Sequence, residues 1–244
     1  MRRVLSLCST LLFLAGCAQF GFRARGVAVP VGEVGEALAR VARGAEQRSS
    51  LRAMGRLELD VPAGGSRVDE VVLAQRPDQL RLESLSPLGQ AVSVLVTDGE
   101  RYGYFDGARL ESGDLSESTL RERVGLALDV REAVELLLAA PAAASSFPRA
   151  AFRIDSELWI ELEGWRLCID PQGELAVLEA LDPRGKLRWR ARYLGWRDVP
   201  GGRYPEALSI EFPRTHVEVR LRLSRVELNA SLAAERFRVP EVRR

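Results

Sequence analysis

Two hydrophobic periods alternate along this chain. In short runs bounded by Gly, Pro and Asp, apolar residues occupy every second position, which is the pattern of half-buried strands in an antiparallel sheet. The clearest run covers 217–223, where Val and Leu alternate with Glu and Arg. Further strands are expected between 57 and 105 and at 152–154, 158–162, 165–169, 176–180, 187–193 and 208–212. The pattern predicts an antiparallel meander of about eleven strands.

Helical spacing interrupts this alternation in three places. Residues 33–48 carry Val34, Leu38, Val41 and Ala45 on one face, and residues 116–127 predict a second helix. Asp129 is a suitable N-cap for a third helix over 130–139, which is apolar on most sides and should be buried. A sheet with helices inserted in mid-sequence favours a mainly β fold, a strongly curved antiparallel incomplete β-barrel covered by central helices.

A short loop joins the predicted strands 79–85 and 91–97. Pro87 fixes its own backbone and Gly89 can adopt a positive φ, so Leu88 is held at the tip of a turn. One interpretation is that Leu88 folds back onto the core, as most loop leucines do. The other is that it is an exposed tip that contacts a membrane or a partner.

The first residues are typical of a lipoprotein signal. A basic start precedes an apolar run over 4–15, and Leu14-Ala15-Gly16-Cys17 matches a bacterial lipobox. We therefore expect a signal peptide over 1–16, an acylated Cys17 that anchors the chain in a membrane, a tether over 17–32 and a folded domain over 33–244. Ala18, rather than Asp, follows the cysteine, which favours the outer membrane.

Composition excludes several classes of function. The chain is 46% apolar and 28% charged, and removal of Arg2 and Arg3 with the signal leaves a net charge near −1, so nothing indicates nucleic acid binding. Cys168 would have no disulfide partner in the mature chain and is expected to be a buried structural thiol. His216 is the one histidine, and the sequence has no metal-ligand cluster, nucleophile elbow or phosphate loop. We expect no enzyme activity, metal or cofactor.

Three motifs resemble the LolA/LolB family of lipoprotein carriers and are most similar to its outer-membrane receptor branch, LolB. They are a strand that leads into Ser86-Pro87-Leu88-Gly89, the residues Asp98-Gly99-Glu100-Arg101-Tyr102, and the apolar residues 136–141 that end the third helix. Their order and spacing match over roughly residues 54–141. The resemblance implies a half-barrel that holds the acyl chains of a lipoprotein, and it places the membrane-insertion leucine at Leu88.

The leading hypothesis is therefore an outer-membrane lipoprotein, facing the periplasm, that accepts lipoproteins and inserts them in the membrane. Its partners would be the membrane, lipoprotein acyl chains and a periplasmic LolA-like carrier. The residues expected in the hydrophobic cavity are Leu57, Leu59, Leu82, Val94 and Leu137. The alternative is an envelope scaffold or secretion-complex lipoprotein with the same fold and no lipid transfer, whose hollow is filled by its own side chains.

Overall fold

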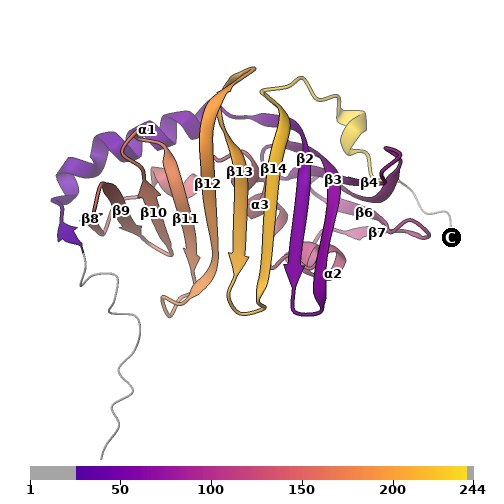
Figure 1. The fold of residues 1–244 in the computed structure, drawn as a ribbon, viewed down its shortest axis with the longest axis horizontal. Coiled ribbons are helices and arrows are strands. Elements are labelled where there is room, and N and C mark those ends of the chain that lie inside the picture. The colour runs from indigo at the N-terminus through magenta and orange to yellow at the C-terminus, as the bar shows by residue number, and fades with distance from the viewer. Residues whose placement is uncertain (1–25, 241–244) are drawn as a thin grey trace, which may run out of the picture.

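The described residues, 26–240 of the computed structural model, form one antiparallel sheet of 14 strands with a few helices (Figure 1). The order across the sheet is β1-β8-β9-β10-β11-β12-β13-β14-β2-β3-β4-β5-β6-β7. The chain starts at one edge, crosses to the middle, meanders to the far edge, returns through α2 and α3, and meanders back to the middle. Strands β14 and β2, far apart in sequence, are therefore neighbours.

The strand bounds follow the two meanders. The first consists of β2 Ser50–Val61, β3 Gly64–Gln75, β4 Gln79–Leu85, β5 Ala91–Thr97, β6 Arg101–Phe105 and β7 Leu110–Asp114. The second consists of β8 Ala150–Ile154, β9 Glu157–Leu162, β10 Trp165–Ile169, β11 Leu175–Leu181, β12 Leu187–Val199, β13 Gly202–Phe212 and β14 Val217–Leu228. The short edge strand β1 is Val27–Ala28.

Register and close approach shape the centre of the sheet. Val219 pairs with Leu59 and Leu221 with Leu57, which sets apolar side chains from β14 and β2 side by side on one face. The register shifts between Leu223 and Arg225. Beside this bulge lies Gly55, where an added Cβ would meet the carbonyl oxygen of Arg222 at 2.2 Å. Only glycine allows the two backbones to approach so closely at this point.

The helices follow the predicted positions with different ends. α1 Gly35–Glu46 follows the 3-10 turn Val31–Val34 and buries the predicted face of the first helix. α2 Thr119–Val124 is shorter than the predicted 116–127, because Gly125 adopts a φ of 75° and ends the helix. α3 Val130–Leu137 has Asp129 as its N-cap, as the sequence predicted, and Glu132 completes a capping box. In Figure 1, α2 and α3 lie behind the central strands, and we call the face they cover the inner face.

Four side chains hold the C-terminal end of α3 against the sheet and α1. Tyr193 donates to the carbonyl of Leu136 at 3.3 Å, Tyr204 donates to that of Leu137, Arg48 to that of Ala139 at 2.7 Å, and Arg76 to that of Ala140 at 2.7 Å. The last carbonyls of a helix have no partner within the helix, so the bonds to Leu137, Ala139 and Ala140 satisfy acceptors that have no backbone donor among the described residues, while the carbonyl of Leu136 also accepts from the N–H of Ala139. They fix the helix over the sheet.

The strand count exceeds the prediction of about eleven, although the mainly β, antiparallel class is confirmed. The edge strands β1 and β7 were missed because β1 has two residues and β7, with the sequence LESGD, has little apolar alternation. Residues 27–28 pair with β8, so the sheet begins within the range expected to be a tether, before the expected domain start at residue 33. Cys17 and the expected signal peptide lie outside the described residues, so both remain predictions.

Candidate functional site

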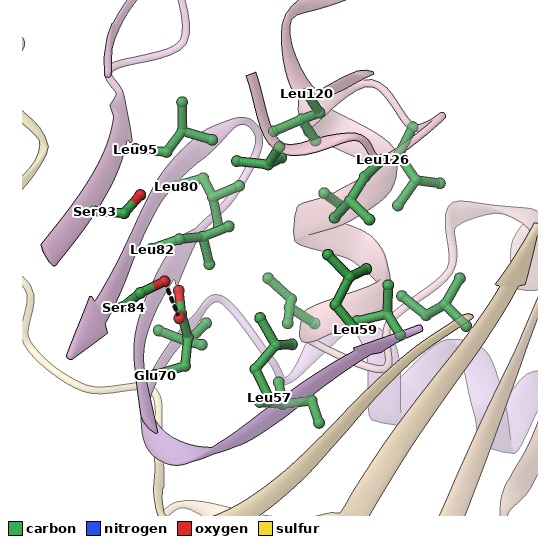
Figure 2. A pocket seen from close by; sticks show the side chains of 18 of the residues that line it. Leu57, Leu59, Glu70, Leu80, Leu82, Ser84, Ser93, Leu95, Leu120 and Leu126 are labelled. Carbon is green, nitrogen blue, oxygen red and sulfur yellow. Dashed lines mark hydrogen bonds between the residues drawn. The ribbon is translucent and has the colours of Figure 1, made fainter. Parts of the chain in front are cut away.

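An apolar cavity of about 270 Å³ lies between the inner face of the sheet and the segment that carries α2 and α3 (Figure 2). Leucines from both layers dominate its wall. They are Leu57 and Leu59 of β2, Leu80 and Leu82 of β4, Leu95 of β5, Leu208 and Leu221 of the second meander, and Leu120, Leu126, Leu128, Leu136 and Leu137 of the covering segment. Because several of these side chains are only half-buried, the cavity offers apolar surface that the protein itself does not fill.

The structure brings together four of the five residues expected in the cavity. Leu57, Leu59, Leu82 and Leu137 line it, whereas Val94 does not. The neighbours of Val94 on β5, the residues 93 and 95, line the cavity instead, and alternation places Val94 on the opposite, outer face. The expectation that the side chain of Val94 faces the cavity was therefore wrong.

The reason is that the more apolar face of β5, with Val92, Val94 and Val96, is the outer face, whereas Ser93 and Leu95 line the cavity. The C-terminal segment, which includes the 3-10 turn Ala234–Phe237, covers the outer face here: Arg81 donates to the carbonyl of Arg236, and Val96 lies beside Val239 and Pro240 around Gly103. Val96 is consequently as buried as Leu95. The alternation of Val92, Val94 and Val96 therefore predicted the wrong face, because this apolar row packs toward the C-terminal segment and not toward the cavity.

Leu88 projects from the β4–β5 loop and is 87% exposed. The loop is held by its own hydrogen bonds: the N–H of Gly89 donates to the carbonyl of Ser86 at 2.8 Å, and the N–H of Ser86 donates to the carbonyl of Gln90 at 2.8 Å. Gly89 has a φ of 78°, the left-handed conformation expected for it. The leucine therefore stands on a defined turn and does not fold back onto the core.

One acidic side chain lies within the apolar wall. Glu70 of β3 is only 3% exposed, and its Oε2 accepts a hydrogen bond from the Ser84 hydroxyl at 2.8 Å, drawn as a dashed line in Figure 2. Burial raises the pKa of Glu70 to about 7, with a further rise from the nearby charge of Glu83 and an opposing effect of the Ser84 hydrogen bond. Sequence reasoning missed Glu70, although its position between Val68 and Val72 in an alternating strand places it on their face.

Arg123 of α2 is the basic residue in the cavity wall. It pairs with Glu111 at 2.8 Å and donates to the Tyr102 hydroxyl at 2.7 Å, and its guanidinium lies over the tyrosine ring. These partners direct its charge toward β6 and β7. The cavity therefore combines an apolar body with one buried acid and one paired base.

Other chemistry-bearing residues lie apart from the cavity. Cys168 is a buried free thiol on β10 whose pKa is raised by burial, as expected for a structural thiol. His216 is exposed in the β13–β14 turn. Within residues 26–240, no group of three His, Cys, Asp or Glu side chains could hold a metal ion, and no helix there is long and apolar enough to cross a membrane.

Comparison with known proteins identifies the fold. No protein-family model and no curated protein matches the sequence. Similar solved structures include a LolA superfamily protein from Nitrosomonas europaea, with a TM-score of 0.58 and 13% identity over 82% of this chain and 97% of that one. A domain from Vibrio parahaemolyticus assigned to outer membrane lipoprotein sorting has a TM-score of 0.58 and 10% identity over 85% of this chain and 97% of that one.

A DUF1329 family protein from Desulfovibrio piger is also similar, with a TM-score of 0.54 and 8% identity over 86% of this chain and 97% of that one. At these identities the likeness concerns the fold alone. The chain has one large, open antiparallel sheet with a LolA-like fold, so the mainly β class is confirmed, whereas the strand count differs from the expected number. The finer resemblance to the LolB branch remains a prediction.

Proposed function

We propose that this protein is a lipid-anchored envelope protein that binds an acyl chain of a lipoprotein in its half-barrel and delivers that lipoprotein to the outer membrane. The observation that carries the proposal is the apolar cavity of about 270 Å³ between the sheet and the covering helices. Hydrophobic clefts of this kind, with few polar groups, are the usual form of a small-ligand site. The similarity of the fold to a LolA superfamily protein and to a lipoprotein-sorting domain supports the proposal.

The size of the cavity limits what it holds. An engineered apolar cavity of about 150 Å³ is large enough for benzene, so the space here suits a segment of one acyl chain rather than several chains. Each buried methylene contributes ~0.8 kcal/mol, and a segment of about eight would gain ~6 kcal/mol. That free energy corresponds to a dissociation constant between about 1 mM and 1 μM, which is compatible with both uptake and release.

Leu88 supplies the second part of the proposal. Leaving a leucine exposed forgoes ~1.5–3 kcal/mol of burial, which contact with a membrane interior would restore. We propose that this tip touches the membrane during delivery, while an acylated Cys17 retains the protein at the outer membrane and a periplasmic LolA-like carrier supplies the passenger. The absence of an enzyme activity is part of the same proposal.

The alternative is an envelope scaffold with this fold and no lipid transfer. In such a protein the hollow would be filled by its own side chains. The open apolar volume beside half-buried leucines supports the carrier instead, because unfilled apolar surface lowers stability unless a ligand covers it.

A pair of matched substitutions tests the proposal. Leu82→Trp places a large ring in the cavity, and Val94→Trp places the same ring on the outer face of the neighbouring strand. Binding of a fluorescent dodecanoyl probe to the full chain is measured by titration, with thermal unfolding as the check on folding. We expect binding to wild type and to Val94→Trp and a loss of at least tenfold in Leu82→Trp. Absence of binding to folded wild type would favour the scaffold.

A further inference from the structure

Glu70 belongs to a polar row that crosses the wall of the apolar cavity. It pairs in register with Ser84 of β4, which in turn pairs with Ser93 of β5, and all three residues line the cavity. Figure 2 shows Ser84 and Glu70 joined on the sheet side, across the cavity from Leu120 and Leu126 of the covering segment. A chain that occupies the cavity therefore shares its wall with this row.

The carboxyl of Glu70 retains capacity to accept hydrogen bonds. An ionised carboxylate has about four acceptor positions, and among the described residues Ser84 is the one hydrogen-bond donor to it. A buried acid without full hydrogen bonding lowers stability, and an apolar side chain in its place would pack with Val68 and Val72. A bound ligand with a donor group would satisfy this acceptor.

The surroundings of Glu70 distinguish between possible ligand head groups. A fatty acid anion would bring a second carboxylate to a buried carboxylate, and like charges in one site repel strongly. The guanidinium of Arg123 would attract such an anion, but it is already paired with Glu111. A hydroxyl or amide N–H beside the chain would instead donate to Glu70, and such charge-assisted bonds are about twice as strong as neutral ones.

We infer that Glu70 selects the ligand of the cavity, so that a neutral amphiphile with a hydroxyl or amide N–H next to its acyl chain binds in preference to a free fatty acid. This inference rests on the proposed function, because it requires that acyl chains enter the cavity. It adds to the proposed function the chemical class of the ligand, a neutral amphiphile. Glu70 is a specificity-determining residue, and the row with Ser84 and Ser93 is the polar part of the site.

The test compares two competitors of equal chain length, dodecanol and dodecanoate. Each displaces a fluorescent acyl probe from the full-length protein at pH 8, where Glu70 is mostly ionised, at concentrations below micelle formation. The measured quantity is the ratio of the two inhibition constants. For Glu70→Gln, which keeps the shape and removes the charge, we expect dodecanoate to bind roughly tenfold more tightly than in wild type. The preference for the alcohol should fall accordingly.

Glu83→Gln is the matched control, because Glu83 is adjacent to Ser84 but lies on the outer face, where it pairs with Arg81. Its ratio should equal that of wild type. A ratio that is the same in Glu70→Gln and wild type, with both competitors active, would overturn the inference and leave the proposed function standing. Failure of both competitors to displace the probe from wild type, or failure of the probe to bind, would overturn the proposed function itself.

Discussion

Replacing Glu70 by glutamine should change how the stability of this protein depends on pH. Burial raises the pKa of this carboxyl from its usual 4.5 to about 7. In the unfolded chain the group ionises near its usual pKa, so between pH 4.5 and pH 7 the folded state holds a proton that the unfolded state has lost. The contribution of Glu70 to the free energy of unfolding is therefore most favourable below pH 4.5 and decreases as the pH rises to about 7.

The size of the effect follows from the shift. A pKa difference of one unit corresponds to 1.36 kcal/mol, so a rise from 4.5 to about 7 corresponds to ~3 kcal/mol. Glu70 is only 3% exposed, so solvent screens little of this. Glutamine keeps the volume and can still accept from Ser84, but it does not ionise. We expect Glu70→Gln to match wild type near pH 4 and to exceed its free energy of unfolding by up to ~3 kcal/mol at pH 8.

Urea denaturation of both proteins at several pH values between 4 and 8 measures this difference. The comparison is made as variant minus wild type, which cancels the titration of the surface ion pairs. Glu83→Gln, on the outer face, serves as the control and should show a much smaller pH-dependent difference. A difference between Glu70→Gln and wild type that stays constant from pH 5 to pH 8 would refute the reasoning, because it would mean that Glu70 is not held protonated by burial.

Three further predictions concern the loop and the covering helix. Leu88→Glu should change the free energy of unfolding by less than about 0.5 kcal/mol, because the side chain is exposed, yet it should slow insertion of a lipoprotein into vesicles; unchanged insertion would remove Leu88 from the proposal. Tyr204→Phe leaves the buried carbonyl of Leu137 without its donor and should lower stability by ~1–3 kcal/mol in urea denaturation, whereas no loss would mean that water replaces the bond. Asp129→Ala removes the N-cap of α3 and should lower the same free energy by ~0.5–2 kcal/mol, and an unchanged denaturation midpoint would show that the cap is dispensable.

The sequence predicted correctly those strand and helix ends that are marked by a turn or capping residue next to them. β4 and β5 have the bounds expected from Pro87 and Gly89 between two apolar runs, and α3 begins at the Asp129 cap. The end of α2 was placed too late, because the apolar residues 126–128 continue the helical spacing beyond Gly125 while its left-handed backbone ends the helix. The prediction followed the apolar spacing and did not take Gly125 as the end of the helix.

Long-range packing explains what the sequence left open. The apolar row of β5 that contains Val94 faces the C-terminal segment, which lies more than a hundred residues later in the chain, so alternation alone assigned this row to the cavity and was wrong. Glu70 was missed for a different reason. An acid in an alternating strand is normally assigned to solvent, and only the three-dimensional position of α2 and α3 shows that this face is enclosed.

The central claim is that the cavity holds an acyl chain, and native mass spectrometry of the full chain, released from membranes in mild detergent, tests it most directly. We predict that wild type and Val94→Trp each carry one noncovalently bound acylated molecule and that Leu82→Trp carries none. Wild-type protein that is folded, free of any bound acyl chain and associated with a stoichiometric envelope protein would contradict the claim and support the scaffold.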